Sequence, residues 1–180
     1  MFEEHIETIY KTMESETSNI NTFINDIYNT IKNKKKVIIF GNGGSSSDAS
    51  HFAGELVGRY KSNRRTLPAL SLSSDSAVIT CIANDFGYDH IFSRQIISLA
   101  NSGDLLIGIS TSGTSKNVLK AFSCGKSLGI NSWLLTGNNH QVGATDANYE
   151  IRVQSKKTKI IQEMHIMLIH QACEALEEFL

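Results

Sequence analysis

A histidine, a carboxylate and several small polar residues lie close together in residues 41–56, GNGGSSSDASHFAGEL. His51 and Glu55 are four residues apart, so on a helix they would share one face. Such a pair can carry out general acid–base chemistry. The order of the two residues differs from HExxH, so the spacing does not indicate a zinc protease. Taken alone, the pair could equally be a surface contact.

A second group of polar side chains lies in the last expected helix, residues 158–180. Gln162, Glu163, His165 and His170 interrupt a run that is otherwise apolar. Gln162 and His170 are eight residues apart, so on a helix they lie about two turns apart on roughly one side. A polar pair on so apolar a helix must face a polar site or each other. A histidine here could also be a hydrogen-bonded core residue.

Two strand–loop–helix segments, residues 37–50 and 105–120, have loops rich in Gly, Ser, Thr and Asn. In an open α/β sheet ligands bind beyond the carboxyl ends of the strands, and helix N-termini attract anions. The loops lack the Walker A lysine, and Ser46 replaces the third glycine of a dinucleotide fingerprint. We therefore predict a phosphate monoester, with plain helix capping as the alternative. The serines of the first loop are expected to cap its helix. The predicted phosphate donors are Ser110, Thr111, Ser112 and Ser115.

Short apolar runs alternate with helical stretches, which predicts a parallel sheet covered on both faces. Strands are expected at 37–40, 67–72, 104–110, 132–136 and 149–153, and helices at 45–60, 75–83, 89–100, 114–128 and 158–180. Residues 2–33 predict one long helix, or two with a break near residues 15–19. Pro68 is expected at a strand start or on an edge. We predict one α/β domain over residues 1–180, with a helical segment at 1–35 and a sandwich core at 36–180.

The composition narrows the classes of partner. The chain has 180 residues, a hydrophobic content of 41% and a formal net charge of −1. A net charge this close to zero does not attract the negatively charged backbone of a nucleic acid. No apolar run approaches the ~20 residues of a membrane span. Three widely spaced cysteines without a CxxC pair argue against a disulfide framework. We expect a cytoplasmic protein with neither nucleic-acid nor membrane partners.

Four motifs, in order, resemble one known family. GNGGSSSDASHFAGEL, NDFGYDHIFSRQ (84–95), GISTSGTSKNV (108–118) and IIQEMHIMLIH (160–170) are similar to those of the phosphoheptose isomerases of the sugar isomerase (SIS) family. The resemblance implies a flavodoxin-like three-layer α/β sandwich and a homotetramer with the N-terminal helices in its interface. It also implies conversion of sedoheptulose 7-phosphate to D-glycero-D-manno-heptose 7-phosphate. That reaction is the first step toward the heptose of lipopolysaccharide core, S-layer or capsule glycans.

The resemblance also implies roles for individual residues. It implies that Glu55 and His170 are the acid–base groups, which suits a carbonyl that moves between C2 and C1 through an enediol. It implies that substrate contacts Asn42, Gly43, Gly44, Ser45, Glu55, Asn84, Asp85, Ser110, Thr111, Ser112, Ser115 and Gln162. It implies one zinc ion per subunit on His51, Glu55, Gln162 and His170, although glutamine is an uncommon zinc ligand.

Two departures and two alternatives bear on this reading. Gly54 stands where the family often has a second glutamate, and Ile160 stands where an arginine is common. These differences concern substrate preference or subunit contacts.

A paralogue of the fold is a tetrameric interaction protein that binds the replication initiator; it lacks the counterparts of Glu55 and His170, and this chain has both. A SIS module that senses sugar phosphates would not need that pair.

Overall fold

The computed structural model describes residues 2–139 and 141–179, and within them the strands form one five-stranded sheet. The strands are β1 (Val37–Gly41), β2 (Ala69–Ser71), β3 (Leu105–Ser110), β4 (Asn131–Gly137) and β5 (Tyr149–Val153). Their order is β2-β1-β3-β4-β5, and every neighbouring pair is parallel. The predicted parallel sheet is confirmed, and Pro68 immediately precedes the edge strand β2, as expected.

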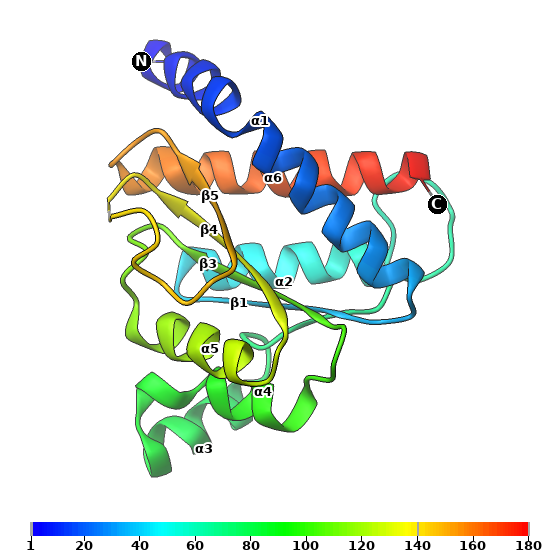
Figure 1. The fold of residues 1–180 in the computed structure, drawn as a ribbon, viewed down its shortest axis with the longest axis vertical. Helices are drawn as coiled ribbons and strands as arrows, with labels where there is room; N and C mark the ends of the chain where they lie inside the picture. The colour runs from blue at the N-terminus through cyan, green and yellow to red at the C-terminus, as the bar shows by residue number, and fades with distance from the viewer. Residues whose placement is uncertain (1, 140, 180) are drawn as a thin grey trace.

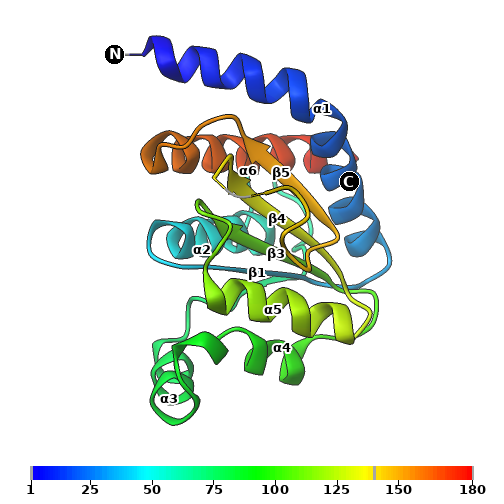
Figure 2. The same cartoon turned by 60° about the vertical axis from the view of Figure 1, so that its left-hand side comes forward.

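Helices cover both faces of the sheet, which confirms the three-layer sandwich (Figures 1 and 2). One layer contains α1 (Glu3–Lys32), α2 (Gly44–Val57) and α6 (Thr158–Phe179). The other contains α3 (Ser76–Phe86), the 3₁₀ turn η1 (Tyr88–His90), α4 (Ser93–Leu99) and α5 (Lys116–Ser127). Leu180, the expected end of the last helix, lies outside the described residues.

The strand residues alternate between these two layers. Val37 and Ile39 of β1 pack with α1, α2 and α6, whereas Ile38 and Phe40 pack with the helices of the opposite layer. All four side chains are fully buried. A strand that is covered on both faces must be apolar at every position, which explains the continuous apolar runs of the sequence.

The predicted helix at 89–100 is divided, and the predicted helix at 75–83 is longer than expected. The Asp75 carboxylate accepts the backbone N–H groups of Ala77 and Val78, so it is the N-cap of α3. The helix then ends at Gly87, whose φ of 89° favours glycine. The chain continues through η1 into α4, so a 3₁₀ turn and a short α-helix occupy the range where the periodicity suggested one helix.

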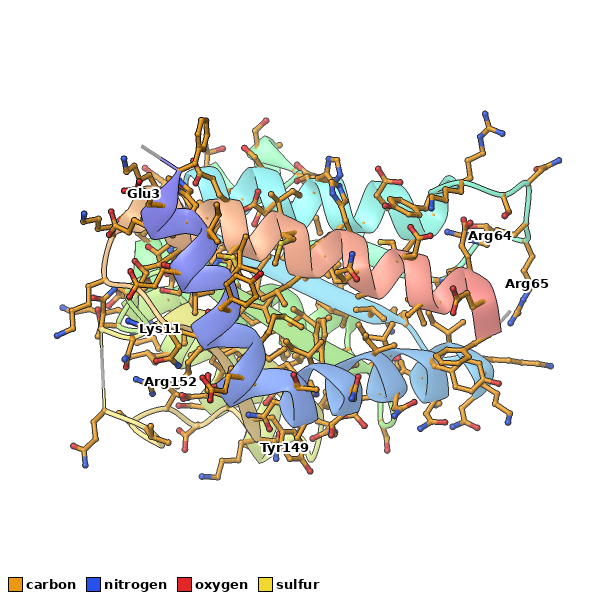
Figure 3. The ribbon with its side chains drawn as sticks, turned by 90° about the horizontal axis from the view of Figure 1, so that it is seen from above. Glu3, Lys11, Arg64, Arg65, Tyr149 and Arg152 are labelled. Carbon is orange, nitrogen blue, oxygen red and sulfur yellow. The ribbon has the colours of Figure 1, made fainter. Side chains whose placement is uncertain are left out.

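Helix α1 is continuous, and no break occurs near residues 15–19. It changes direction partway along its length (Figures 1 and 3). Side-chain hydroxyls of Ser15 and Thr17 donate to carbonyls of the preceding turn, an arrangement that often bends helices. The second half buries Ile20, Phe23 and Ile27 against the sheet, and the first half extends away from it (Figure 1).

Candidate active site

The first predicted loop joins β1 to α2 by a glycine turn. Gly43 precedes α2 with φ 56°, and a Cβ at Gly41 would lie 2.7 Å from the Ser45 carbonyl oxygen. Both positions therefore need glycine. The expectation that serines cap this helix is wrong, because Gly43 is the N-cap and no side-chain cap bond forms. Ser45 and Ser46 lie inside the first turn of α2, since the glycine turn lets the helix begin earlier.

The predicted acid–base residues meet between α2 and α6. His51 Nε2 lies 3.3 Å from Glu55 Oε1 and 3.1 Å from His170 Nε2. The His51 side chain is 43% exposed and the Glu55 side chain 22%, so the group is open to solvent on one side. The Tyr60 ring flanks His170 with the ring centroids 5.8 Å apart. Two imidazoles and a carboxylate thus share one small volume, as general acid–base catalysis requires.

These distances allow a test of the predicted zinc site. Zinc–nitrogen bonds are about 2.0–2.1 Å, so two ligand atoms of a tetrahedral ion lie roughly 3.3 Å apart. The His51–His170 and His51–Glu55 distances of 3.1 and 3.3 Å agree with that spacing. Within residues 2–139 and 141–179, however, no group of three His, Cys, Asp or Glu side chains forms a metal site. The ligand types and these two separations fit zinc, and zinc binding stays a prediction.

Gln162 lies on α6 against the glycine turn that opens α2. A Cβ at Gly44 would overlap the Gln162 amide nitrogen, so the absence of a side chain at Gly44 lets the amide approach the backbone. The structure therefore places Gln162 beside the first loop, and His170 further along the same helix faces His51. The two residues predicted to share one side of α6 both face α2.

The second predicted loop gathers hydroxyl groups at the end of β3. Ser110 Oγ lies 3.2 Å from Ser115 Oγ and 3.5 Å from Ser112 Oγ. Ser115 is the N-cap residue of α5, and its side chain makes no cap hydrogen bond. The capping alternative therefore does not account for this hydroxyl. Thr111 contributes its backbone carbonyl to Gly137 N–H instead, which fixes the loop against β4.

An amide pair that the sequence did not indicate joins the two loops. Asn42 and Asn117 exchange side-chain hydrogen bonds of 2.9 and 2.8 Å, and the Tyr88 hydroxyl donates to Asn42 over 3.0 Å. Asn117 is 3% exposed, so this contact holds the loops after β1 and β3 together. No local signal distinguished it from an ordinary residue of α5. Asn84 and Asp85 lie exposed at the end of α3 and hydrogen-bond to each other.

Two further titratable groups lie on the helices of the site: Asp48, which the sequence did not single out, and His165, which it placed among the polar residues of the last helix. Asp48 is one turn before His51 on α2, and its Oδ2 is buried without a partner among the described residues. Burial raises the pKa of this carboxyl. His165 on α6 is fully buried, and burial lowers its pKa to about 4, so its imidazole is neutral at physiological pH. The sequence had allowed a core histidine on this helix, whereas nothing in it indicated the environment of Asp48.

Known proteins share this fold and sequence over nearly the whole chain. The phosphoheptose isomerase of Helicobacter pylori strain P12 is 46% identical over 173 residues, which cover 96% of this chain and 90% of that protein. The phosphoheptose isomerase of Campylobacter concisus is 49% identical over 152 residues, covering 84% of this chain and 80% of that protein.

Solved structures and a domain family agree with these relatives. The phosphoheptose isomerase of Neisseria gonorrhoeae superposes with a TM-score of 0.90 at 34% identity, covering 98% of this chain and 95% of that one. That of Francisella tularensis gives 0.91 at 32% identity, with coverages of 98% and 94%. The SIS domain family matches residues 1–137. The chain therefore belongs to the SIS domain family and, within it, to the phosphoheptose isomerases.

Proposed function

We propose that this protein is an aldose–ketose isomerase that converts sedoheptulose 7-phosphate to D-glycero-D-manno-heptose 7-phosphate. The observation that carries the proposal is the meeting of Glu55, His51 and His170 within hydrogen-bonding distance in a phosphoheptose isomerase fold. The Asn42–Asn117 pair couples the glycine turn to the loop with the serine hydroxyls. This arrangement suits a phosphorylated sugar whose reacting carbons reach the acid–base cluster.

In the mechanism that these residues support, Glu55 removes the proton from C1 of the ketose. His170 moves a proton between the oxygens on C1 and C2, so that an enediol forms and collapses without a stranded charge. The proton held by Glu55 then returns to C2, which gives the aldose. Ser110, Ser112 and Ser115 would hold the phosphate through neutral donors at the N-terminus of α5.

Zinc binding is part of the proposal. His51, Glu55, Gln162 and His170 would hold the ion, supported by the two imidazoles and one carboxylate already in contact. A bound zinc ion would polarise the carbonyl oxygen. Every proton transfer described above stays with Glu55 and His170.

We further propose a cytoplasmic homotetramer of single-domain subunits, whose product feeds heptose into lipopolysaccharide core, S-layer or capsule glycans. Phe2, Ile6, Tyr10 and Met13 form an exposed apolar stripe on α1, which supports association through that helix. The cysteines are free, as expected in a reducing compartment. Within the described residues no helix is long and apolar enough to cross a membrane.

The test is incubation of the purified protein with sedoheptulose 7-phosphate, with aldose formation followed by NMR. We expect turnover, and we expect a chelator to reduce it and added zinc to restore it. Turnover that is insensitive to chelator would uphold the isomerase function and reject the proposed role of zinc. A protein that binds the sugar phosphate without turning it over would instead be a sensing module. A protein that neither binds the sugar phosphate nor turns it over would favour the interaction-protein alternative.

A further inference from the structure

Arg64, in the segment after α2, caps the carboxyl end of that helix. Its Nη2 donates to the Glu55 carbonyl over 2.7 Å, and its Nη1 donates to the Leu56 carbonyl over 3.1 Å. The last carbonyls of a helix have no intrahelical partner, so a cation at this end satisfies them and opposes the helix dipole. One of the two carbonyls that Arg64 binds therefore belongs to the proposed catalytic base.

The same guanidinium also reaches α6. Arg64 Nε lies 3.4 Å from Glu177 Oε1, and the side chains are 11% and 9% exposed. Glu177 in turn accepts the backbone N–H groups of Lys61 and Ser62 over 3.0 and 2.9 Å. These backbone donors lower the pKa of Glu177 to about 2, and the hydrogen bond from Lys61 has the largest effect. Arg64 and Glu177 thus form a bridge from the end of α2 to the end of α6.

The bridge is aligned with the acid–base cluster. Glu177 is seven residues beyond His170, so the two lie on one side of α6, two turns apart. The segment that Glu177 holds by its backbone also carries Tyr60, whose ring flanks the His170 ring. Figure 3 labels Arg64 beside this end of the molecule, with its neighbour Arg65 farther out. Both ends of the bridge are therefore tied to residues of the cluster.

We propose that Arg64 and Glu177 are positioning residues that fix the separation between α2 and α6, and so hold Glu55 and His170 in reacting geometry. The inference rests on the proposed isomerase function. An arginine suits this role better than a lysine, because its planar fork donates to both helix-end carbonyls while its charge lies beside the Glu177 carboxylate. Catalytic groups displaced by about 1 Å can lose on the order of 100-fold in rate.

The kinetic test compares Arg64→Ala, Arg64→Lys and Glu177→Gln with the parent. The matched control is Arg65→Ala, because Arg65 is exposed and contacts Arg64 through its backbone carbonyl, which the substitution keeps. We expect kcat to fall by roughly 10- to 100-fold in Arg64→Ala with KM little changed, because the phosphate loop is untouched. Arg64→Lys should recover part of the loss, and Arg65→Ala should match the parent. A raised KM with unchanged kcat would overturn the proposal.

A double-mutant cycle separates positioning from general stability. Once Glu55→Gln has removed the base, loss of the bridge should lower the residual rate little further. Fully multiplicative effects would mean that Arg64 acts independently of Glu55, and the proposal would fail. Rates are compared per folded molecule. If Arg64→Ala does not fold, the milder Glu177→Gln substitution takes its place in the cycle.

A measurement without substrate distinguishes this inference from the proposed function. The ring signals of His170, assigned by their loss in His170→Asn, should shift in Arg64→Ala and Glu177→Gln and stay in place in Arg65→Ala. Shifted signals in a protein that lacks isomerase activity would uphold the bridge and reject the function. Unmoved signals in an active isomerase would reject the bridge and uphold the function.

Discussion

At the scale of single residues, the contact of His51 with both Glu55 and His170 allows a direct test of the proposed base. Glu55→Gln keeps the size and a hydrogen bond to His51 but removes the basic carboxylate. Isomerisation should fall by at least about 100-fold, a typical loss when acid–base catalysis is removed. The rate is measured by NMR, and sugar-phosphate binding by calorimetry should persist. Glu14→Gln, an exposed change on α1, is the control, and a parent-like rate in Glu55→Gln would exclude this base.

The serine hydroxyls of the second loop make a different prediction, because they concern binding. Ser110→Ala combined with Ser115→Ala removes two neutral donors that lie 3.2 Å apart. Each hydrogen bond to a charged phosphate contributes about 1.5–3 kcal/mol, so KM should rise by at least tenfold. Steady-state kinetics measure this, with Ser127→Ala at the far end of α5 as control. Equal use of unphosphorylated sedoheptulose by the parent would contradict the assignment.

At the scale of elements, the α2–α6 bridge should make stability depend on pH. The folded-state pKa of Glu177 is lowered from the ordinary 4.5 to about 2, so the unfolded state binds the proton more readily. The stabilisation is present above about pH 4.5 and is lost as pH falls toward 2. Urea unfolding should show Glu177→Gln less stable than the parent at neutral pH, with the difference shrinking across this range. Glu178→Gln, its exposed neighbour, should show no such difference.

At the scale of the whole molecule, the exposed stripe on α1 predicts self-association. Phe2 is 73% exposed and Tyr10 72%, on a half-helix that extends beyond the sheet (Figure 2). Light scattering should give an oligomer for the parent. Ile6→Glu combined with Tyr10→Glu should shift it toward 19.9 kDa, because burial of carboxylates disfavours the interface. Ile97→Glu, at a position 67% exposed on α4, is the control. A parent that is already monomeric would exclude the tetramer.

The sequence by itself determined the sheet, the two loops and most helices. Strands buried on both faces need unbroken apolar runs, and strand-to-helix turns need Gly and Ser, so both features are visible locally. His51 and Glu55 could be placed together because helix geometry fixes a four-residue spacing. The capping expectation failed at the first loop, because the unusual φ of Gly43 permits the helix to begin before the serines.

Only the tertiary structure decided which distant residues meet. His51 and His170 are separated by 119 residues, and Lys61 and Glu177 by 116. The Asn42–Asn117 pair is separated by 75 residues. Such contacts depend on the order β2-β1-β3-β4-β5 and on the packing of α2 against α6, which no local periodicity encodes. The burial of His165 and of the Asp48 Oδ2 atom has the same cause, since burial is a property of the assembled layers.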